Sequence, residues 1–407
     1  MLAAALLFVL ADASQPFNYM DQLRNAELAA ASDPQPNRAM VSHPLGTARS
    51  FVGETELAQA MYARSSATPA PTPEETSAET RRLASMLSEH EPRDAIAAIV
   101  EQARARQIVI LNEAHGMPRH RAFATLLGLE LRKLGFEYLA VETLNGRGEP
   151  AALAARVAAL RERGYPLVDD GYYSKEPVFG DFLRRSLAAG YRPVAYEFDA
   201  YPPGSDAWRS IDRQVLREEG QAQNIVDRVL AGDPKARIFV YVGHGHVSKG
   251  LTDFDGRKIA LMAESLRIKS GIDPFCIEQS LNAWQKAAER DRPMVDQFFA
   301  RYSGDSMVLA AKTGGGYWNP GNVDIQVWHR PVMLTNGRPH WLSMDGYRSP
   351  RRIPAKLLPR EGRRLIQAFV AGESPDAVPM DQVLVSAGKP PPMLMLPKGK
   401  YRFAYQD

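Results

Sequence analysis

Two short clusters contain half of the eight histidines in this chain of 407 residues. The first is Asn112-Glu113-Ala114-His115, which follows the apolar run IVIL and is followed by His120. The second is Gly243-His244-Gly245-His246, which follows the run IFVYV. A neutral imidazole near pH 7 takes a proton from water or binds a transition metal. The clusters therefore predict a site for general-base or metal chemistry.

Carboxylates occupy the same kind of position as the histidines. Glu142 ends the run YLAVE, while Glu197 and Asp199 end the run PVAYEFD. All four runs have the composition of buried strands, and ligands bind at the carboxyl ends of parallel strands in α/β proteins. We expect these histidines and carboxylates to meet at one edge of one sheet.

The elements that must position these groups alternate along the chain. Helical patterns separate several of the β-rich runs, such as the one at 123–134, with apolar residues spaced three or four apart, and the one at 211–231. This alternation predicts an α/β fold with a mostly parallel central sheet flanked by helices on both faces. The β-rich runs are residues 108–111, 138–142, 193–198, 238–243, 274–279, 307–311 and 325–328.

The predicted helix at 211–231 has a polar face of its own. Arg217, Gln221 and Asn224 are spaced by four and three residues, so they share one side of the helix. An arginine there offers a fixed fork of donors to a carboxylate or an oxyanion. The alternative is a solvated helix surface.

Composition excludes several classes of protein. The 50 Lys and Arg nearly balance the 47 Asp and Glu, which is unlike a protein that coats nucleic acid. The single cysteine, Cys276, excludes an internal disulfide framework and a cysteine-based zinc site. The chain also lacks the Gly-x-Ser-x-Gly, His-Glu-x-x-His and phosphate-loop motifs, which disfavours the common serine hydrolases, zinc peptidases and nucleotide hydrolases.

Four segments are expected along the chain. Residues 1–13 are a candidate signal peptide that predicts a periplasmic or secreted protein, although no basic residue precedes the apolar run 2–10, and a frayed apolar N-terminus is the alternative. Residues 14–85 are expected to hold a Pro/Ser/Thr-rich linker, 86–345 the α/β domain, and 346–407 a Pro- and Lys-rich extension. No other stretch is long and apolar enough to predict a transmembrane segment.

The motifs together resemble those of the erythromycin esterase, ChaN and Tiki superfamily. That family has Gly-Glu-x-His after one strand, Glu after the next, Arg-Asp/Glu and Ala-x-Asn on a helix, and Gly-x-x-His after a later strand. One departure is Asn112, which stands where the family has glycine. The matching residues, in the same order over roughly 105–250, are Asn112–His115 with His120, Glu142, Arg217-Glu218, Ala222–Asn224 and Gly243–His246.

The branches of this superfamily imply different activities. Erythromycin esterases are metal-independent hydrolases that open a lactone with a histidine-activated water, and Tiki proteins are similar to metal-dependent peptidases. ChaN-like proteins bind haem. The resemblance therefore supports the fold and the site better than the reaction. With the candidate signal peptide and the histidine clusters, we expect an exported hydrolase of an ester, lactone or amide in a small molecule or peptide, which uses a histidine-activated water with or without a metal. The alternative is a haem- or metal-binding protein, and a third hypothesis is a structural or toxin-associated domain that keeps the site as a remnant.

Each hypothesis gives the residues definite roles. In a metal-free hydrolase His115 is the general base, Glu113 or Glu142 holds its ring, and His246 or Arg217 stabilises the oxyanion. In the metal form a divalent ion is bound by His115, His246 and either Glu142 or Glu113. In the haem form His115 is the ligand, and Tyr172, Tyr173 and Phe179 are candidates for the pocket lining, although a partly buried loop is the preferred interpretation of this aromatic segment. The supporting or substrate-binding residues are His120, Glu197, Asp199, Glu218, Asn224 and His244.

Overall fold

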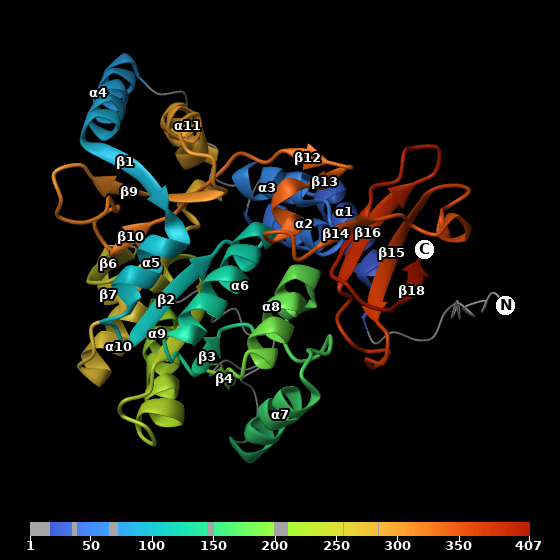
Figure 1. Ribbon diagram of the computed structural model, residues 1–407, viewed down its shortest axis with the longest axis horizontal. Coiled ribbons are helices and arrows are strands. Elements are labelled where there is room, and N and C mark those ends of the chain that lie inside the picture. The colour runs from blue at the N-terminus through green and yellow to red at the C-terminus, as the bar shows by residue number, and fades with distance from the viewer. Residues whose placement is uncertain are drawn as a thin grey trace.

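A parallel sheet forms the centre of the molecule (Figure 1). The computed structural model describes residues 17–34, 39–64, 72–144, 150–198, 211–254, 256–283 and 285–407. Six strands in these residues pair in the order β10-β8-β2-β5-β3-β4, all parallel, which confirms the predicted α/β class. They are β2 (Ile108–Glu113), β3 (Tyr138–Val141), β4 (Arg192–Ala195), β5 (Ile238–Gly243), β8 (Phe275–Glu278) and β10 (Ile325–Gln326).

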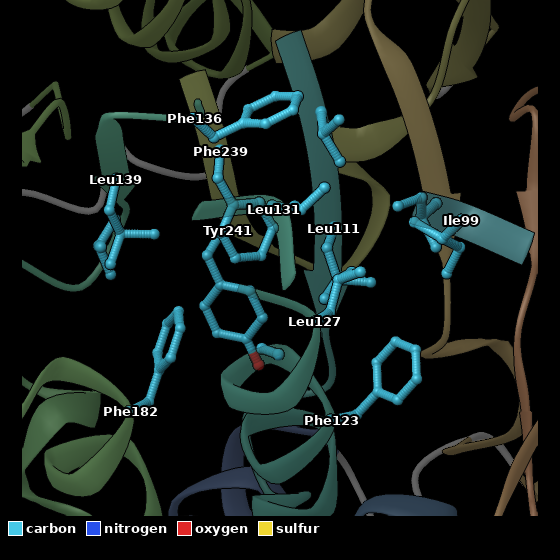
Figure 2. Close-up of a cluster of buried hydrophobic side chains, with 14 of the residues drawn as sticks. Ile99, Leu111, Phe123, Leu127, Leu131, Phe136, Leu139, Phe182, Phe239 and Tyr241 are labelled. Carbon is cyan, nitrogen blue, oxygen red and sulfur yellow. The ribbon is translucent and has the colours of Figure 1, made fainter. Parts of the chain in front are cut away.

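Helices cover both faces of this sheet because its central strands are apolar on both sides. In β2, Val109 and Leu111 belong to one buried cluster, while Ile108 and Ile110 belong to another. Figure 2 shows the first cluster, in which Leu111 lies among aromatic side chains. The helices that contribute to this first cluster are α5 (Ala95–Ala103), α6 (Pro118–Lys133), α7 (Pro150–Arg163) and α8 (Pro177–Ala188). The opposite face of the sheet is covered by α9 (Ile211–Ile225), which continues into a π-helical turn (Val226–Leu230), and by α10 (Met262–Ser270).

Two of the predicted strands lie partly or wholly outside the parallel sheet. The run at 307–311 forms β9 (Ser306–Ala311), which pairs antiparallel with β1 (His90–Asp94) and β11 (Trp328–His329). The run at 325–328 is divided between β10 and β11, which belong to different sheets. Side-chain composition identifies a strand, but the pairing depends on partners distant in sequence.

The predicted linker is partly wrong. Residues 73–80 of the Pro/Ser/Thr-rich stretch form the start of a helix, α4 (Pro73–Glu89). Thr72 Oγ1 accepts the backbone N–H of Glu75, and Glu75 accepts that of Thr72, so a capping box precedes Pro73 in the first turn. The rest of 14–85 contains α1 (Tyr19–Ser32), α2 (Ala39–Phe51) and α3 (Thr55–Arg64). Residues 1–13 and 65–71 lie outside the described part of the chain.

The C-terminal residues, for which the sequence allowed either an extended tail or a small appendage, form a folded unit. The strands β15 (Arg363–Val370), β16 (Asp381–Ser386) and β18 (Tyr401–Gln406) make an antiparallel sheet, and β14 (Ser349–Arg351) pairs with β17 (Leu394–Leu396). The sheet packs on the N-terminal helices, where Leu365 joins Tyr19 and Phe51 in one buried cluster. A buried ion pair of 2.8 Å between Arg348 and Asp181 connects the unit to α8.

The remaining elements are short or peripheral. None of the helices formed by the described residues is long and apolar enough to cross a membrane. In the described ranges these elements are the hairpin β6 (Leu251–Phe254) and β7 (Arg257–Ala260), α11 (Gln285–Phe299), β12 (Leu334–Thr335), β13 (Arg338–Pro339), and 3₁₀ turns at Tyr173–Lys175, His244–Val247, Leu281–Ala283, His340–Ser343 and Ala355–Leu357.

The packing of the two terminal segments predicts that Leu365 contributes strongly to stability. Its side chain is fully buried between the C-terminal sheet and the N-terminal helices. Replacing Leu365 by Ala is expected to lower the free energy of unfolding by about 2–5 kcal/mol, since a buried leucine leaves a cavity. Leu334→Ala is the matched control, because Leu334 is 57% exposed, and its effect should stay within about 0.5 kcal/mol. Denaturant unfolding of both variants measures the difference, and equal losses would contradict the packing described.

Candidate active site

The carboxyl edge of the parallel sheet opens into a cavity of about 820 Å³. Four of its strands deliver predicted site residues to this edge: His115 follows β2, Glu142 follows β3, Glu197 follows β4 and His246 follows β5. Helix α9 contributes Arg217. Asp199 lies outside the described residues. The full lining is His115, Glu142, Thr143, Leu144, Asp169, Gly171, Tyr172, Tyr173, Lys175, Glu197, Arg217, His244 and His246.

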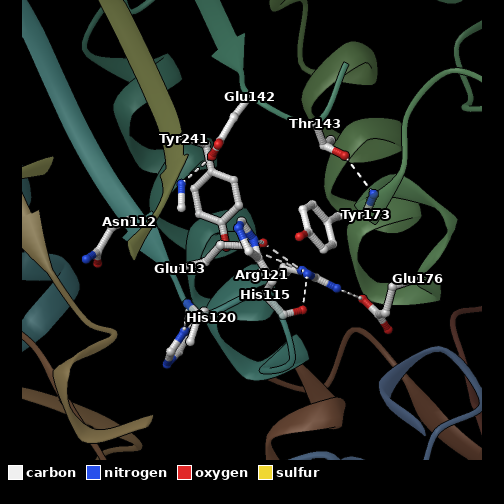
Figure 3. A network of polar contacts seen from close by, with 12 residues as sticks. Asn112, Glu113, His115, His120, Arg121, Glu142, Thr143, Tyr173, Glu176 and Tyr241 are labelled. Atoms are coloured by element: carbon white, nitrogen blue, oxygen red, sulfur yellow. Dashed lines mark hydrogen bonds and ion pairs between the residues drawn. The ribbon is translucent and has the colours of Figure 1, made fainter. Parts of the chain in front are cut away.

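Glu113 orients the ring of His115. The Nδ1 atom of His115 lies 2.9 Å from Glu113 Oε1, so a proton on Nδ1 is donated to the carboxylate (Figure 3). The neutral ring then has its lone pair on Nε2, for which the described residues supply no hydrogen-bond partner. The ring stacks on Tyr173, with a centroid distance of 3.9 Å and an interplanar angle of 11°. His115 is thus held as a base whose free nitrogen is available to a ligand.

The Glu113 carboxylate is saturated by donors. Arg121 donates Nε to Oε2 at 2.8 Å and Nη2 to Oε1 at 3.0 Å, and the hydroxyl of Tyr241 donates to Oε2 at 2.9 Å. Burial alone would raise the pKa of Glu113, but the charges and hydrogen bonds of Arg121 and His115 outweigh it and hold this pKa well below its usual value. Glu113 therefore stays ionised and accepts the hydrogen bond from Nδ1 of His115.

Arg121 is itself fixed by several contacts. Its Nη2 donates to the carbonyl of His115 at 2.6 Å, and its Nη1 donates to Glu176 at 3.2 Å. The guanidinium lies over the ring of Phe179, 5.0 Å from the centroid. Glu176 also caps α8 by accepting the backbone N–H groups of Val178 and Phe179, each at 2.9 Å. This network joins the His115 loop to two helices.

Arg217 is the centre of a second charged cluster in the cavity. Its Nη2 donates to Glu142 Oε1 at 2.6 Å and also to Glu197, and its Nε donates to Glu197 Oε1 at 3.0 Å. Burial would raise the pKa of Glu142, but the charges of His246, Arg217 and His115 outweigh it and lower this pKa to about 2. The cluster therefore keeps Glu142 charged beside the guanidinium.

Both ring nitrogens of His246 are engaged. Its Nδ1 lies 2.6 Å from Glu218 Oε2, and its Nε2 lies 3.0 Å from Nη1 of Arg217. A neutral His246 that donates Nδ1–H to Glu218 and accepts from Arg217 satisfies both contacts. Burial lowers the pKa of His246, but Glu218 and Glu142 outweigh it, and the net direction is upward. In the arrangement described, His246 positions Arg217 and offers no free donor to an oxyanion.

The residues as arranged do not fit the expected divalent metal site. Arg217 hydrogen-bonds Glu142 Oε1 and Nε2 of His246, the atoms that a shared metal would need together with His115. The guanidinium also places a positive charge between the proposed ligands. The described residues contain no group of three or more His, Cys, Asp or Glu side chains arranged to hold a metal ion.

A haem does not fit the cavity either. Tyr172 and Tyr173 line it as expected, but Phe179 is a buried core residue that does not. Several of the lining groups, among them Glu142, Glu197 and Arg217, are charged. A flat apolar porphyrin requires walls that are mostly apolar, whereas these walls suit a polar ligand.

The other predicted residues have different positions. His120 is turned away from the cavity, and its Nδ1 accepts the backbone N–H of Ala114 at 3.0 Å. Asn224 shares the predicted face with Arg217 and Gln221, but it donates to the carbonyl of Tyr196 at 3.0 Å and so fixes the end of β4. Glu218 holds His246 from outside the cavity lining.

Asn112 and His244 join the ends of three strands. Asn112 Nδ2 donates to the carbonyl of His244 at 2.8 Å and to Glu278 at 2.7 Å, and its Oδ1 accepts the backbone N–H of Gln279 at 2.8 Å. The residue that stands in place of the family glycine is therefore a buried cross-link between β2, β5 and β8. His244 lines the cavity with a φ of 40°, and burial, followed by the charge of His115, lowers its pKa to about 3.

Position 243 requires a glycine because the side chains of His115 and Glu142 approach its backbone closely. A Cβ added there would lie 2.4 Å from His115 Cε1 and 2.7 Å from His115 Nε2, which is too close, and 3.0 Å from Glu142 Oε2, which is tight. The backbone N–H of Gly243 also donates to Glu142 Oε2. The glycine therefore lets the β2 and β3 ends approach the β5 end.

Sequence reasoning missed the residues that support His115. Arg121 and Tyr241 are charged or polar residues in an apolar helix face and strand, which is a signal of a buried polar network. Tyr173 was considered only for the haem hypothesis, and its stacking on His115 depends on a 3₁₀ turn far along the chain. Only the pairing of distant segments reveals these contacts.

The charged clusters predict a loss of stability in acid. Carboxylates whose pKa is lowered in the folded state stabilise it above their unfolded pKa, and this stabilisation disappears as pH falls. For Glu142 the window runs from about 4.5 down to about 2. In Glu142→Gln the free energy of unfolding should fall less steeply across this window, by at most about 1.4 kcal/mol per pH unit, which is the value for one proton. Urea unfolding from pH 2 to 6 measures both slopes, and identical slopes would contradict the assignment.

Removal of Arg121 is expected to destabilise the protein strongly. In Arg121→Met the buried Glu113 and Glu176 lose their shared cation, and breaking a buried ion pair costs about 3–5 kcal/mol. Arg93→Met is the control, because the Arg93–Glu91 pair is exposed and should contribute about 0–1 kcal/mol. Chemical denaturation compares the variants, and a loss for Arg121→Met no larger than the control's would refute the role of this ion pair.

Comparisons with known proteins add little to this geometry. No protein-family model matches the chain, and no curated protein matches it. Solved structures similar to it include the type III effector HopBA1, with a TM-score of 0.34 and 14% identity over 58% of this chain and 94% of that one. Another is RRSP, an effector domain of a MARTX toxin from Vibrio vulnificus CMCP6, with a TM-score of 0.30 and 17% identity over 61% of this chain and 44% of that one.

Proposed function

We propose that this chain is a hydrolase that cleaves an ester, lactone or amide with a water activated by His115. The observation that carries the proposal is the Glu113–His115 pair, in which Nδ1 is held at 2.9 Å by a buried carboxylate while Nε2 has no protein partner among the described residues. This is the arrangement of a histidine base with an orienting carboxylate. The resemblance of the motifs to those of the erythromycin esterases supports the same reaction.

The proton transfers follow from this arrangement. Nε2 of His115 removes a proton from water, the water oxygen bonds to the carbonyl carbon, and the carbonyl electron pair moves to oxygen. The protonated ring then gives its Nε2 proton to the leaving oxygen or nitrogen as that bond breaks. Glu113 and the face of Tyr173 both stabilise the imidazolium formed in between.

Arg217 supplies the positive charge for the oxyanion. Its guanidinium lines the cavity and is held by Glu142, Glu197 and His246, so it is oriented before the substrate arrives. A preorganised charge of this kind stabilises charge that develops during the reaction without a reorganisation cost. The role of His246 is then to position Arg217, and Glu142 shares that role.

The proposal assigns the reaction to the free nitrogen of His115. In His115→Ala, hydrolysis of a panel of aryl esters, lactones and anilides should fall by about 10²–10⁴-fold, which is the usual contribution of a general base. Loss of the base should leave the fold intact, so the far-ultraviolet circular dichroism and the unfolding midpoint serve as checks.

His90→Ala is the matched control, because His90 lies on β1 and does not line the cavity. Its turnover of the same panel should equal that of the unchanged protein. Full activity in a folded His115→Ala variant would overturn the assignment, and so would the absence of any turnover of the panel by the unchanged protein.

A further inference from the structure

We propose that a second cavity, formed around His120, binds an organic carboxylate. This His120 cavity has a volume of about 340 Å³ and shares no lining residue with the cavity of His115. It lies at the N-terminal end of α6, where Met117, Arg119 and His120 meet residues that follow β8 and β11. The inference does not depend on the proposed hydrolase activity, because it concerns different side chains and a binding measurement.

His120 offers a hydrogen-bond donor inside this cavity. The side chain is buried, with 2% exposure, and its Nδ1 accepts the backbone N–H of Ala114. A neutral imidazole that accepts through Nδ1 must carry its proton on Nε2. The described residues provide no acceptor for this Nε2–H, and Figure 3 shows the ring of His120 on the side of His115 away from Glu142. Burial lowers the pKa of His120 to about 3, so the ring is neutral when the cavity has no ligand.

The neighbouring His329 differs from His120 in the hydrogen bonding of its ring. His329 lines the same cavity, and its ring centroid is 5.5 Å from that of His120. Its Nδ1 lies 2.8 Å from the hydroxyl of Ser306, and its Nε2 lies 3.0 Å from Oε1 of Gln279. His329 therefore has hydrogen-bond partners for both ring nitrogens within the protein. In His120, only Nδ1 has such a partner among the described residues.

The cavity carries a positive charge that favours an anion. Arg119 is 7% exposed and donates to the carbonyl groups of Arg330 and Asp305, so these hydrogen bonds go to neutral oxygens, although the Asp305 carboxylate places a negative charge nearby. Arg330 also lines the cavity, donates to the carbonyl of Gly304, and has a long ion pair of 4.0 Å with the half-exposed Asp305. The first turn of α6 adds the positive end of a helix dipole. Among the lining residues the carboxylate is Glu56, which is exposed to solvent.

The rest of the lining determines the body of the ligand. Val295, Val327, Val332 and Trp341 provide apolar surface in the same cavity. A carboxylate placed against His120 Nε2–H and Arg119 would therefore extend an aromatic or aliphatic group over these residues. The combination of one charged end and an apolar wall is typical of sites for small organic acids.

Calorimetric titration with benzoate and with its neutral isostere benzamide tests the proposal on the unchanged protein. Benzoate should bind with at least tenfold higher affinity than benzamide, because only the carboxylate pairs with Arg119. Arg119→Gln should weaken benzoate binding at least tenfold. Arg93→Gln, which changes an exposed arginine outside the lining of the cavity, should leave benzoate binding unchanged. Val332→Phe should weaken both probes by filling the apolar side.

Two results would overturn the inference. One is the absence of benzoate binding to the unchanged protein, or equal affinity for benzoate and benzamide. The other is full benzoate binding to a folded Arg119→Gln variant. Should Arg119→Gln not fold, the comparison of the two probes on the unchanged protein together with Val332→Phe still decides the matter. Binding that survives Val332→Phe at full strength would place the ligand elsewhere.

Discussion

The buried ion pair between Glu113 and Arg121 is the interaction on which the site depends. It leaves a carboxylate charged in the interior, where an isolated charge would be too costly. Because that carboxylate accepts the Nδ1 proton of His115, the ion pair fixes which ring nitrogen is free. Arg121 also holds the carbonyl of His115, so one side chain controls both the backbone and the ring of the proposed base.

The two cationic side chains of the site have separate tasks. Arg121 lies beneath His115 and is fully buried, while Arg217 lines the cavity and contacts the carboxylates that follow β3 and β4. In the proposed reaction, this separation places a negative charge behind the proposed base and a positive charge where a substrate oxygen would develop charge. The same guanidinium occupies the atoms that a metal ion would need, so the geometry favours chemistry by proton transfer.

The terminal segments of the chain support this edge of the sheet from outside. The ring of Tyr62 on α3 lies against Gly116, where an added Cβ would be 2.0 Å from the ring, and the Tyr62 hydroxyl lies 2.7 Å from that of Thr47 on α2. The C-terminal sheet in turn packs on these helices through Leu365. The loop of His115 therefore contacts α3, and the C-terminal sheet supports the N-terminal helices from the other side.

The sequence by itself determined the α/β class and the positions of the central strands, since short apolar runs alternating with amphipathic helices have few other solutions. It also indicated which polar residues follow those strands, because the carboxyl ends of parallel strands lie at one edge. Asn112, by contrast, looked like a defect in a motif, and only the structure shows it joining three strands.

Tertiary structure alone decided which polar groups touch. Three features of the site depend on atoms brought together from different segments. They are the choice of Glu113 over Glu142 as the partner of His115, the engagement of both nitrogens of His246, and the placement of His120 in a separate cavity. The pattern of side chains along the sequence indicates burial and secondary structure. Hydrogen bonding, in contrast, requires donor–acceptor distances that are correct to within a few tenths of an ångström, and local sequence does not specify them.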